Sequence, residues 1–162
     1  MSSMCTRASS ERRPPRAVTI LLLALAAAAC QRPNDPPEVQ AARATVLRYN
    51  DRLPLAFRTG NQAVLGDVAE EAEAGRVGAL VTELASRGQV MFARLLDLKI
   101  ESAKMLGPNA VLVETAEAWT YEHRKLDDRD RPVEPARVTY RMSYQVSRES
   151  GAWRVQVATP KK

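Results

Sequence analysis

The sequence of 162 residues has few cysteines and a single histidine, and it lacks the short motifs of several enzyme classes. Two cysteines cannot build a disulfide-rich scaffold, and one histidine argues against a histidine-ligated metal site. There is no glycine-rich phosphate loop, no GxSxG, no CxxC and no HExxH. The sequence therefore predicts neither a metal site nor a cofactor.

Long apolar runs are also scarce. The uncharged stretch AVTILLLALAAAA at residues 17–29 would span about 20 Å as a helix, which is short of a hydrocarbon core of about 30 Å. Residues 1–16 before it hold four arginines and one glutamate, and Cys30 follows it directly. A basic start, a short apolar segment and small residues before a cleavage point are typical of an export signal. A permanent transmembrane helix is the less favoured interpretation.

The residues Ala27-Ala28-Ala29-Cys30 resemble the bacterial lipoprotein signal, in which a peptidase cuts before a diacylated cysteine. Ala27 departs from the larger aliphatic residue that is usual there. The resemblance implies that residues 1–29 are a signal peptide and that Cys30 carries the lipid. It implies that residues 30–37 form a proline-rich tether to the membrane. An ordinary signal peptide, with Cys30 a free thiol, is the alternative.

The same resemblance predicts a location in the bacterial cell envelope. If the host has two membranes, Gln31 after the cysteine favours the outer membrane, with the domain facing the periplasm. Loss of the leader leaves 20 basic and 18 acidic residues, so the formal net charge falls from +5 to +2. A charge this close to zero gives no support for nucleic-acid binding.

The expected domain, residues 38–162, begins with helices. Apolar residues recur at intervals of three and four from residue 39 to residue 57, which predicts one helix with a start signal at Asp35. Pro54 is expected to kink or end this helix near Leu53, because proline lacks a backbone N–H. A second helical region over about residues 62–87 contains Gly66 and Gly75 and is expected in two pieces.

Strands follow the helices. Apolar and polar residues alternate over residues 96–101, 111–125, 138–146 and 153–157. A turn sequence at residues 107–109 separates the first two of these segments, and another at residues 149–151 separates the last two. A charged, proline-containing loop is expected at residues 126–135. Consecutive strands joined by short turns favour antiparallel pairing. The predicted fold class is therefore α+β, with N-terminal helices packed on a curved four-stranded antiparallel sheet.

This order of elements, with stretches such as ATVLRYNDRLPLAFRTGN, resembles the NTF2-like (cystatin-like roll) superfamily. The segment LLDLKIESAKMLGPNAVLVETAEAW is similar to the strand pair of the NTF2-like domain in chloroplast division proteins and their cyanobacterial relatives. The resemblance implies a cone-shaped sheet with helices across its mouth. Enzymes of the superfamily often use an Asp or a His within such a cone.

Alternation along the strand at residues 111–125 places Glu117 on its bulkier face, which is expected to point into the cone. Among apolar neighbours, Glu117 could serve as a general acid or base. Alternatively it is structural, paired with Arg141 or Arg48, or turned toward water by a bulge. His123 lies farther along the same strand, beside the charged loop, and is either a second catalytic candidate or a solvated residue.

Aromatic residues are candidates for the lining of a ligand pocket: Tyr49, Trp119, Tyr121, Tyr140, Tyr144 and Trp153. Aromatic residues at alternating strand positions usually belong to the core, which is the alternative. Lys99, Arg137 and Arg141 fall on the predicted outer face of the sheet, where pairing with acidic neighbours on adjacent strands accounts for them.

Three functions remain open. The sequence favours a lipid-anchored, non-catalytic module that holds an envelope protein or a small apolar ligand. The alternative is a small enzyme that uses Glu117 on a small hydrophobic substrate. A structural subunit that forms a homodimer through the sheet is the third.

Overall fold

The computed structural model describes residues 35–131, 134–149 and 151–161; the predicted signal peptide, Cys30 and most of the predicted tether lie outside the described residues. The elements in chain order are α1 (Pro37–Thr59), the 3-10 helix η2 (Gln62–Leu65), α2 (Glu71–Ser86), β1 (Gln89–Gly107), β2 (Ala110–Lys125), β3 (Ala136–Glu149) and β4 (Ala152–Pro160). Helices come first and strands follow, as the sequence predicts.

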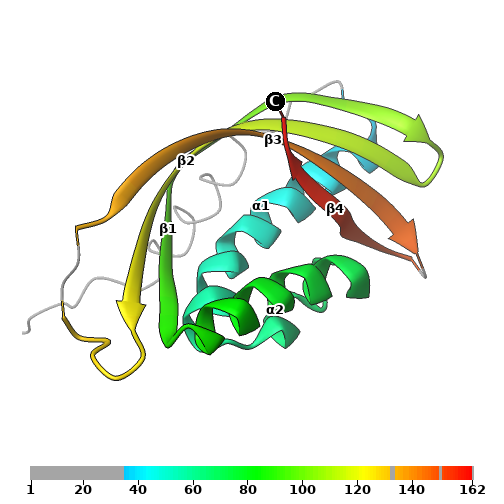
Figure 1. Ribbon diagram of the computed structural model, residues 1–162. Coiled ribbons are helices and arrows are strands. Elements are labelled where there is room, and N and C mark those ends of the chain that lie inside the picture. Colours follow the sequence, from blue (N-terminus) through cyan, green and yellow to red (C-terminus); the bar gives the residue numbers. More distant parts are fainter. Residues whose placement is uncertain (1–34, 132–133, 150, 162) are drawn as a thin grey trace, which may run out of the picture. The chain divides into compact units, whose positions relative to one another are not determined.

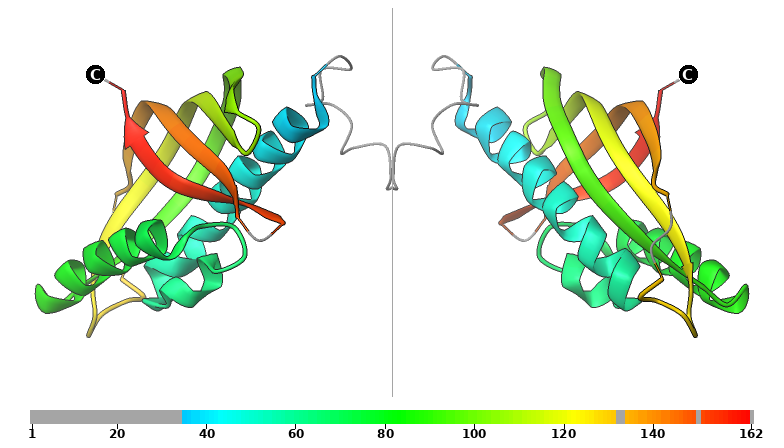
Figure 2. Two further views of the ribbon diagram at one scale, coloured as in Figure 1. Left: turned by 90° about the vertical axis from the view of Figure 1, so that its right-hand side faces the viewer. Right: turned by 90° about the vertical axis from the view of Figure 1, so that its left-hand side faces the viewer.

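The four strands form one sheet in the order β1-β2-β3-β4, and every neighbouring pair is antiparallel. The sheet bends over α1, and α2 lies next to α1 on the same concave side (Figure 1). The side views in Figure 2 show how strongly the strands twist across the sheet. This arrangement confirms the predicted α+β fold class. Among the described residues, no helix has the length and apolar character needed to cross a membrane.

The first helix differs from the prediction at its start and at Pro54. It begins at Pro37, and Asp35 forms an ion pair with Arg43 at 3.1 Å without capping the helix. It also runs through Pro54 and ends at Thr59 before Gly60, so an end near Leu53, one of the two outcomes expected of this proline, is wrong. A proline inside a helix costs about 3 kcal/mol or more. Burial of the residues in the following turn offsets this cost, since that turn packs into the core.

Strand β1 contains three irregularities of register that the sequence pattern does not reveal. Its register against β2 shifts between Leu95 and Asp97, between Ile100 and Ser102, and between Met105 and Gly107. The predicted alternation holds for Leu98 and Ile100, which are half-buried, but the first shift leaves Leu96 exposed. A bulge bends the strand that carries it, which contributes to the curvature of the sheet over the helices.

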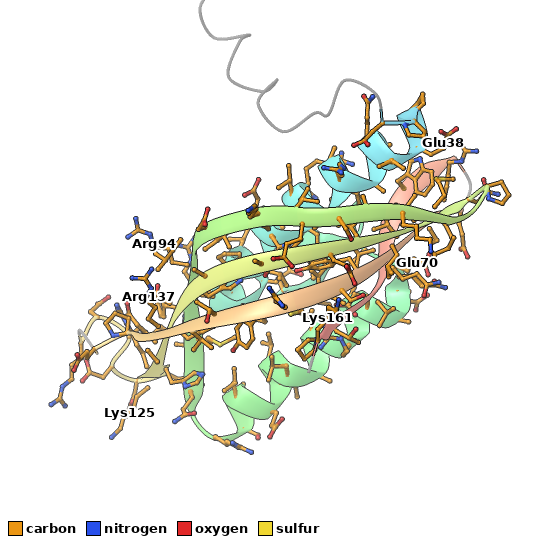
Figure 3. The ribbon with its side chains drawn as sticks, turned by 90° about the horizontal axis from the view of Figure 1, so that it is seen from above. Glu38, Glu70, Arg94, Lys125, Arg137 and Lys161 are labelled. Carbon is orange, nitrogen blue, oxygen red and sulfur yellow. The ribbon has the colours of Figure 1, made fainter. Side chains whose placement is uncertain are left out.

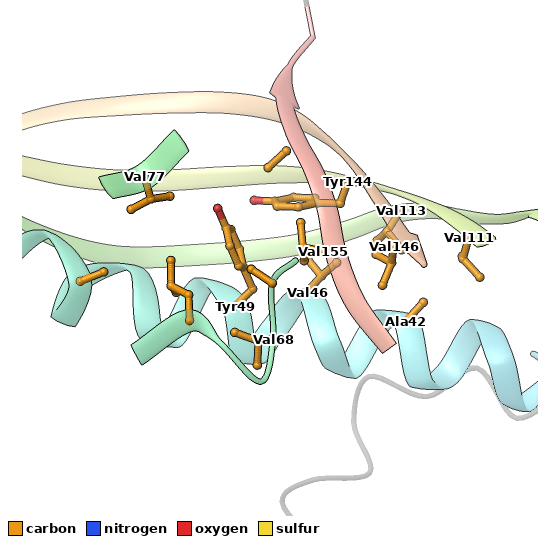
Figure 4. Packing of buried hydrophobic residues seen from close by; sticks show 14 of the residues in the cluster. Ala42, Val46, Tyr49, Val68, Val77, Val111, Val113, Tyr144, Val146 and Val155 are labelled. Carbon is orange, nitrogen blue, oxygen red and sulfur yellow. The ribbon is translucent and has the colours of Figure 1, made fainter. Parts of the chain in front are cut away.

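The core lies between α1 and the concave face of the sheet. Its centre is made of valines from several elements that are fully buried, among them Val46, Val113 and Val146. Figure 4 shows Tyr49 from α1 and Tyr144 from β3 close together beside these valines, with both hydroxyl groups directed toward the side where Val77 lies. The apolar core therefore ends in a polar layer, and the candidate site begins there.

Candidate functional site

A cavity of about 220 Å³ lies between α1, α2 and the concave face of the sheet. Its lining is mostly apolar, with Leu53 and Phe57 from α1, Val77 and Leu80 from α2, and Met142 from β3. The lining also contains five of the six aromatic residues named from the sequence, Tyr49, Trp119, Tyr121, Tyr140 and Tyr144, but not Trp153. These aromatic residues therefore meet in one place, although Tyr49 and Tyr144 also belong to the buried cluster.

Glu117 lies on the same wall of the cavity and is only 5% exposed. It sits opposite Leu98 of β1 and Tyr140 of β3, in the middle of three hydrogen-bonded strands. Because side chains alternate along a strand, Thr115 and Trp119 point to the same side as Glu117. The inward direction deduced from the sequence pattern is the one that the structure has.

Three neutral groups donate hydrogen bonds to the Glu117 carboxylate. Thr115 Oγ1 and the Tyr144 hydroxyl donate to Oε1 at 2.6 and 2.7 Å. Trp119 Nε1 donates to Oε2 at 2.8 Å. Burial of a carboxylate costs free energy unless hydrogen bonds replace its water, and these three bonds provide that replacement.

Neither of the arginines considered as partners reaches Glu117. Arg141 lies 3.7 Å from Glu101 on the exposed side of the sheet, and Arg48 donates to Thr45. No ion pair to Glu117 is found in the part of the chain that the structure describes. The interpretation of Glu117 as the partner of an arginine is therefore wrong, and its charge is held by neutral donors alone.

Tyr144 connects this carboxylate to the first helix. Its hydroxyl accepts a hydrogen bond from Asn50 Nδ2 at 3.1 Å, and the same amide donates to the Val46 carbonyl at 3.0 Å. Burial, together with the charge of Glu117, raises the pKa of Tyr144 well above its ordinary value of 10.0. The phenol is thus protonated at neutral pH and remains a donor to Glu117.

A second buried carboxylate, Glu73 on α2, lies at the edge of the site and was not foreseen. Tyr49 donates its hydroxyl hydrogen to Glu73 at 2.5 Å, and Arg76 binds Glu73 with two nitrogens at 2.6 and 2.9 Å. Burial and the charge of Glu73 raise the pKa of Tyr49. The hydrogen bond to Glu73 raises the pKa of Arg76. The spacing of three residues between Glu73 and Arg76 was the only signal for this pair in the sequence.

His123 is not part of this site. It is exposed, pairs with Met91 across β1 and β2, and does not line the cavity. Six residues of extended strand place it about 20 Å from Glu117. Within the described ranges, no group of three or more His, Cys, Asp and Glu side chains could hold a metal ion.

The outer face of the sheet carries the basic residues expected there. Figure 3 looks onto this face and shows Arg94 and Arg137 near the same end. Arg94 on β1 and Arg137 on β3 are the two cross-strand neighbours of Thr120 on β2, and both are exposed. Of the three basic residues assigned to acidic neighbours, Arg141 has a partner in Glu101, whereas Lys99 and Arg137 form no ion pair with a described residue.

No family model and no curated protein matches this sequence. Among solved structures, the intermembrane space region of the chloroplast protein ARC6 superposes with a TM-score of 0.65 and 19% identity, over 78% of this chain and 98% of that one. The Kfla4162 protein from Kribbella flavida superposes with a TM-score of 0.52 and 9% identity, over 75% of this chain and 90% of that one. A hexachlorocyclohexane dehydrochlorinase, LinA type 2, superposes with a TM-score of 0.50 and 8% identity, over 77% of this chain and 92% of that one.

At identities this low, the superpositions demonstrate a common fold and do not identify a function. The chain shares the fold of the ARC6 intermembrane space region. One of the three neighbours is named as an enzyme, and the names of the other two specify no reaction. The function must therefore be argued from the cavity and its residues.

Proposed function

We propose that this protein is an exported, lipid-anchored NTF2-like domain that binds a small, largely apolar ligand at the cell envelope without transforming it. The observation that carries this proposal is the cavity of about 220 Å³, lined by aromatic side chains and fixed by the hydrogen bonds around Glu117. Concave, mostly apolar pockets with a few convergent polar groups are the usual form of small-molecule sites.

The size of the cavity limits the ligand. An apolar cavity of about 150 Å³ is enough to take up benzene. A cavity of about 220 Å³ therefore suits a molecule with one ring and a short substituent, or a short branched chain. The hydrogen bonds that hold Tyr49 and Tyr144 keep the lining in place, so little free energy is spent on ordering side chains when the ligand enters.

The membrane is the second partner in this proposal. The leader and Ala27-Ala28-Ala29-Cys30 support cleavage and lipidation at Cys30, where each buried CH₂ group of the acyl chains contributes about 0.8 kcal/mol to membrane binding. The domain then faces the periplasm from the outer membrane if the host has two membranes. An envelope protein as partner, and a homodimer through the sheet, stay predictions of the sequence.

A catalytic role for Glu117 is the second candidate, because the cavity reaches this carboxylate and could bring a substrate to it. Two observations favour binding over catalysis. The carboxylate already accepts three hydrogen bonds, and the other titratable candidate, His123, lies outside the cavity. A general acid or base needs direct reach to the proton that it transfers.

The lipid anchor is tested by labelling cells with radioactive palmitate. We expect incorporation into the wild-type protein and into Cys5→Ala, which removes the other cysteine, and none into Cys30→Ala. Equal incorporation into all three proteins would contradict the anchor.

The pocket is tested by extracting the protein from membranes in mild detergent and analysing the small molecules that it releases on denaturation. Leu80→Trp enlarges a half-exposed residue of the cavity lining, and Leu106→Trp makes the same change at an exposed position on β1 that does not line the cavity. We expect one compound, chemically unchanged, with the wild type and with Leu106→Trp, and a loss of it with Leu80→Trp. The same yield from both variants would overturn the proposed function, and a chemically altered compound would favour the enzyme.

A further inference from the structure

The cavity contains one negative charge that the described residues do not neutralise. Glu117 is held by Thr115, Trp119 and Tyr144, which are all neutral. The remaining charged groups at the site are Glu73 and Arg76, which bind each other through two hydrogen bonds. The guanidinium of Arg76 is thus already paired, and the formal charge of the site sums to one negative charge.

One acceptor site of the Glu117 carboxylate has no donor among the described residues. Each carboxylate oxygen offers about two lone-pair sites. Oε1 of Glu117 accepts from Thr115 and Tyr144 and is saturated, whereas Oε2 accepts only from Trp119 among the described residues. A ligand that donates a hydrogen bond to Oε2 would therefore complete the set of donors around the carboxylate.

Aromatic side chains line the cavity next to this carboxylate. The ring of Trp119 stacks on Tyr121 with centroids 6.0 Å apart and planes at 18°, and Tyr121 meets Tyr140 edge-on at 6.4 Å. All three rings line the cavity. Aromatic faces attract cations, and the attraction increases when the cation is removed from water.

We infer that the cavity selects a small organic cation, an alkyl- or arylalkylammonium ion, whose charged nitrogen meets Glu117 and whose apolar body packs against Trp119, Tyr121 and Tyr140. This inference rests on the proposed function, since it requires that the cavity bind a ligand. An anionic ligand is disfavoured, because its charge would face Glu117 without a free cation among the described lining residues. A neutral ligand of the same shape leaves the charge of Glu117 uncompensated.

The test is isothermal titration calorimetry of the purified mature domain at neutral pH with three one-ring probes: benzylammonium, benzyl alcohol and benzoate. The probes share a ring and a similar size and differ in charge. We expect benzylammonium to bind at least tenfold more tightly than benzyl alcohol, and benzoate to bind too weakly to measure. Benzyl alcohol or benzoate binding as tightly as benzylammonium would overturn the inference and leave the pocket itself intact.

A comparison of two variants tests whether the preference for benzylammonium depends on the carboxylate of Glu117. Glu117→Gln removes the charge from the cavity, and Glu101→Gln removes the same charge from an exposed position of β1 outside the cavity. We expect Glu117→Gln to lower the affinity for benzylammonium at least tenfold and to change that for benzyl alcohol less than threefold. Glu101→Gln is expected to change neither. An equal effect of both variants would overturn the role of Glu117.

If Glu117→Gln does not fold, the affinities of the wild-type protein for the three probes still test the inference. If none of the three probes binds to the wild type, the inference on charge is wrong. The proposed function is then judged by the compound that copurifies with the protein, which does not depend on these probes.

Discussion

The hydroxyl of Tyr144 on β3 donates a hydrogen bond to the Glu117 carboxylate on β2, with 2.7 Å between the two oxygens. Both side chains are buried, and Asn50 of α1 donates in turn to the same hydroxyl at 3.1 Å. One phenol therefore ties the first helix to two strands and fixes the carboxylate at the cavity wall. A buried network of this kind is stable only while every polar member has its partner.

The first prediction concerns this phenol. Tyr144→Phe removes the donor to Glu117 and the acceptor of Asn50, and we expect it to lower the free energy of unfolding by about 1–3 kcal/mol. The control is Tyr140→Phe, at another tyrosine of the cavity lining whose hydroxyl has no hydrogen bond to a described residue. Urea denaturation followed by circular dichroism measures both. Equal losses in the two variants would show that the network adds nothing.

The second prediction concerns high pH. Burial and the charge of Glu117 raise the pKa of Tyr144 above its ordinary value of 10.0, and burial with the charge of Glu73 does the same for Tyr49. In the unfolded chain these phenols lose their protons near pH 10, whereas the folded protein retains them. Unfolding therefore releases protons, and the stability, complete below about pH 10, falls as the pH rises further.

Denaturation at a series of pH values between 8 and 11.5 tests this dependence. We expect the free energy of unfolding to decrease above about pH 10 and the decrease to be smaller in Tyr144→Phe, which lacks one of the protons. A stability that does not change over this range, or a decrease as large in the variant as in the wild type, would be inconsistent with a buried, protonated Tyr144.

The third prediction compares two ion pairs on α2. Arg76 binds Glu73, whose side chain is almost completely buried, whereas Arg87 binds Glu83 at 2.5 Å and both of those side chains are mainly exposed. We expect Arg76→Met to cost about 2 kcal/mol, because it leaves a buried carboxylate without its cation. Arg87→Met is expected to change the free energy of unfolding by less than about 0.5 kcal/mol. Equal effects in thermal denaturation would contradict the burial of Glu73.

Local periodicity is enough to predict the strands and the direction of Glu117. Side chains alternate along β2 without a register shift against β3, so each inward residue follows from its parity. In β1 the same rule holds for Leu98 and Ile100, but a register shift between Leu95 and Asp97 leaves Leu96 exposed. A bulge depends on how two strands pair, and the hydrophobic pattern of one strand does not reveal it.

The rest of the site depends on contacts between distant elements. Pro54 suggested a helix end, but packing of the following turn against the sheet keeps the helix intact to Thr59. The partners of Glu117 come from β2 itself and from Tyr144, 27 residues away. Neutral hydroxyl and indole donors are common in any sequence, so the sequence suggested arginine partners that the structure does not contain. The burial of Glu73 likewise follows from how α2 packs.

The two tryptophans of the chain can report whether the cavity takes up a ligand, which is the central proposal. Trp119 lines the cavity and bonds to Glu117, whereas Trp153 on β4 packs near Arg148 and does not line the cavity. The most direct measurement is a titration of the two indole N–H resonances by NMR with one-ring compounds, both neutral and charged. A saturable shift of the Trp119 resonance with at least one compound, while Trp153 stays in place, is the predicted result. Shifts that are absent, or equal at both indoles, for every compound would contradict a binding cavity.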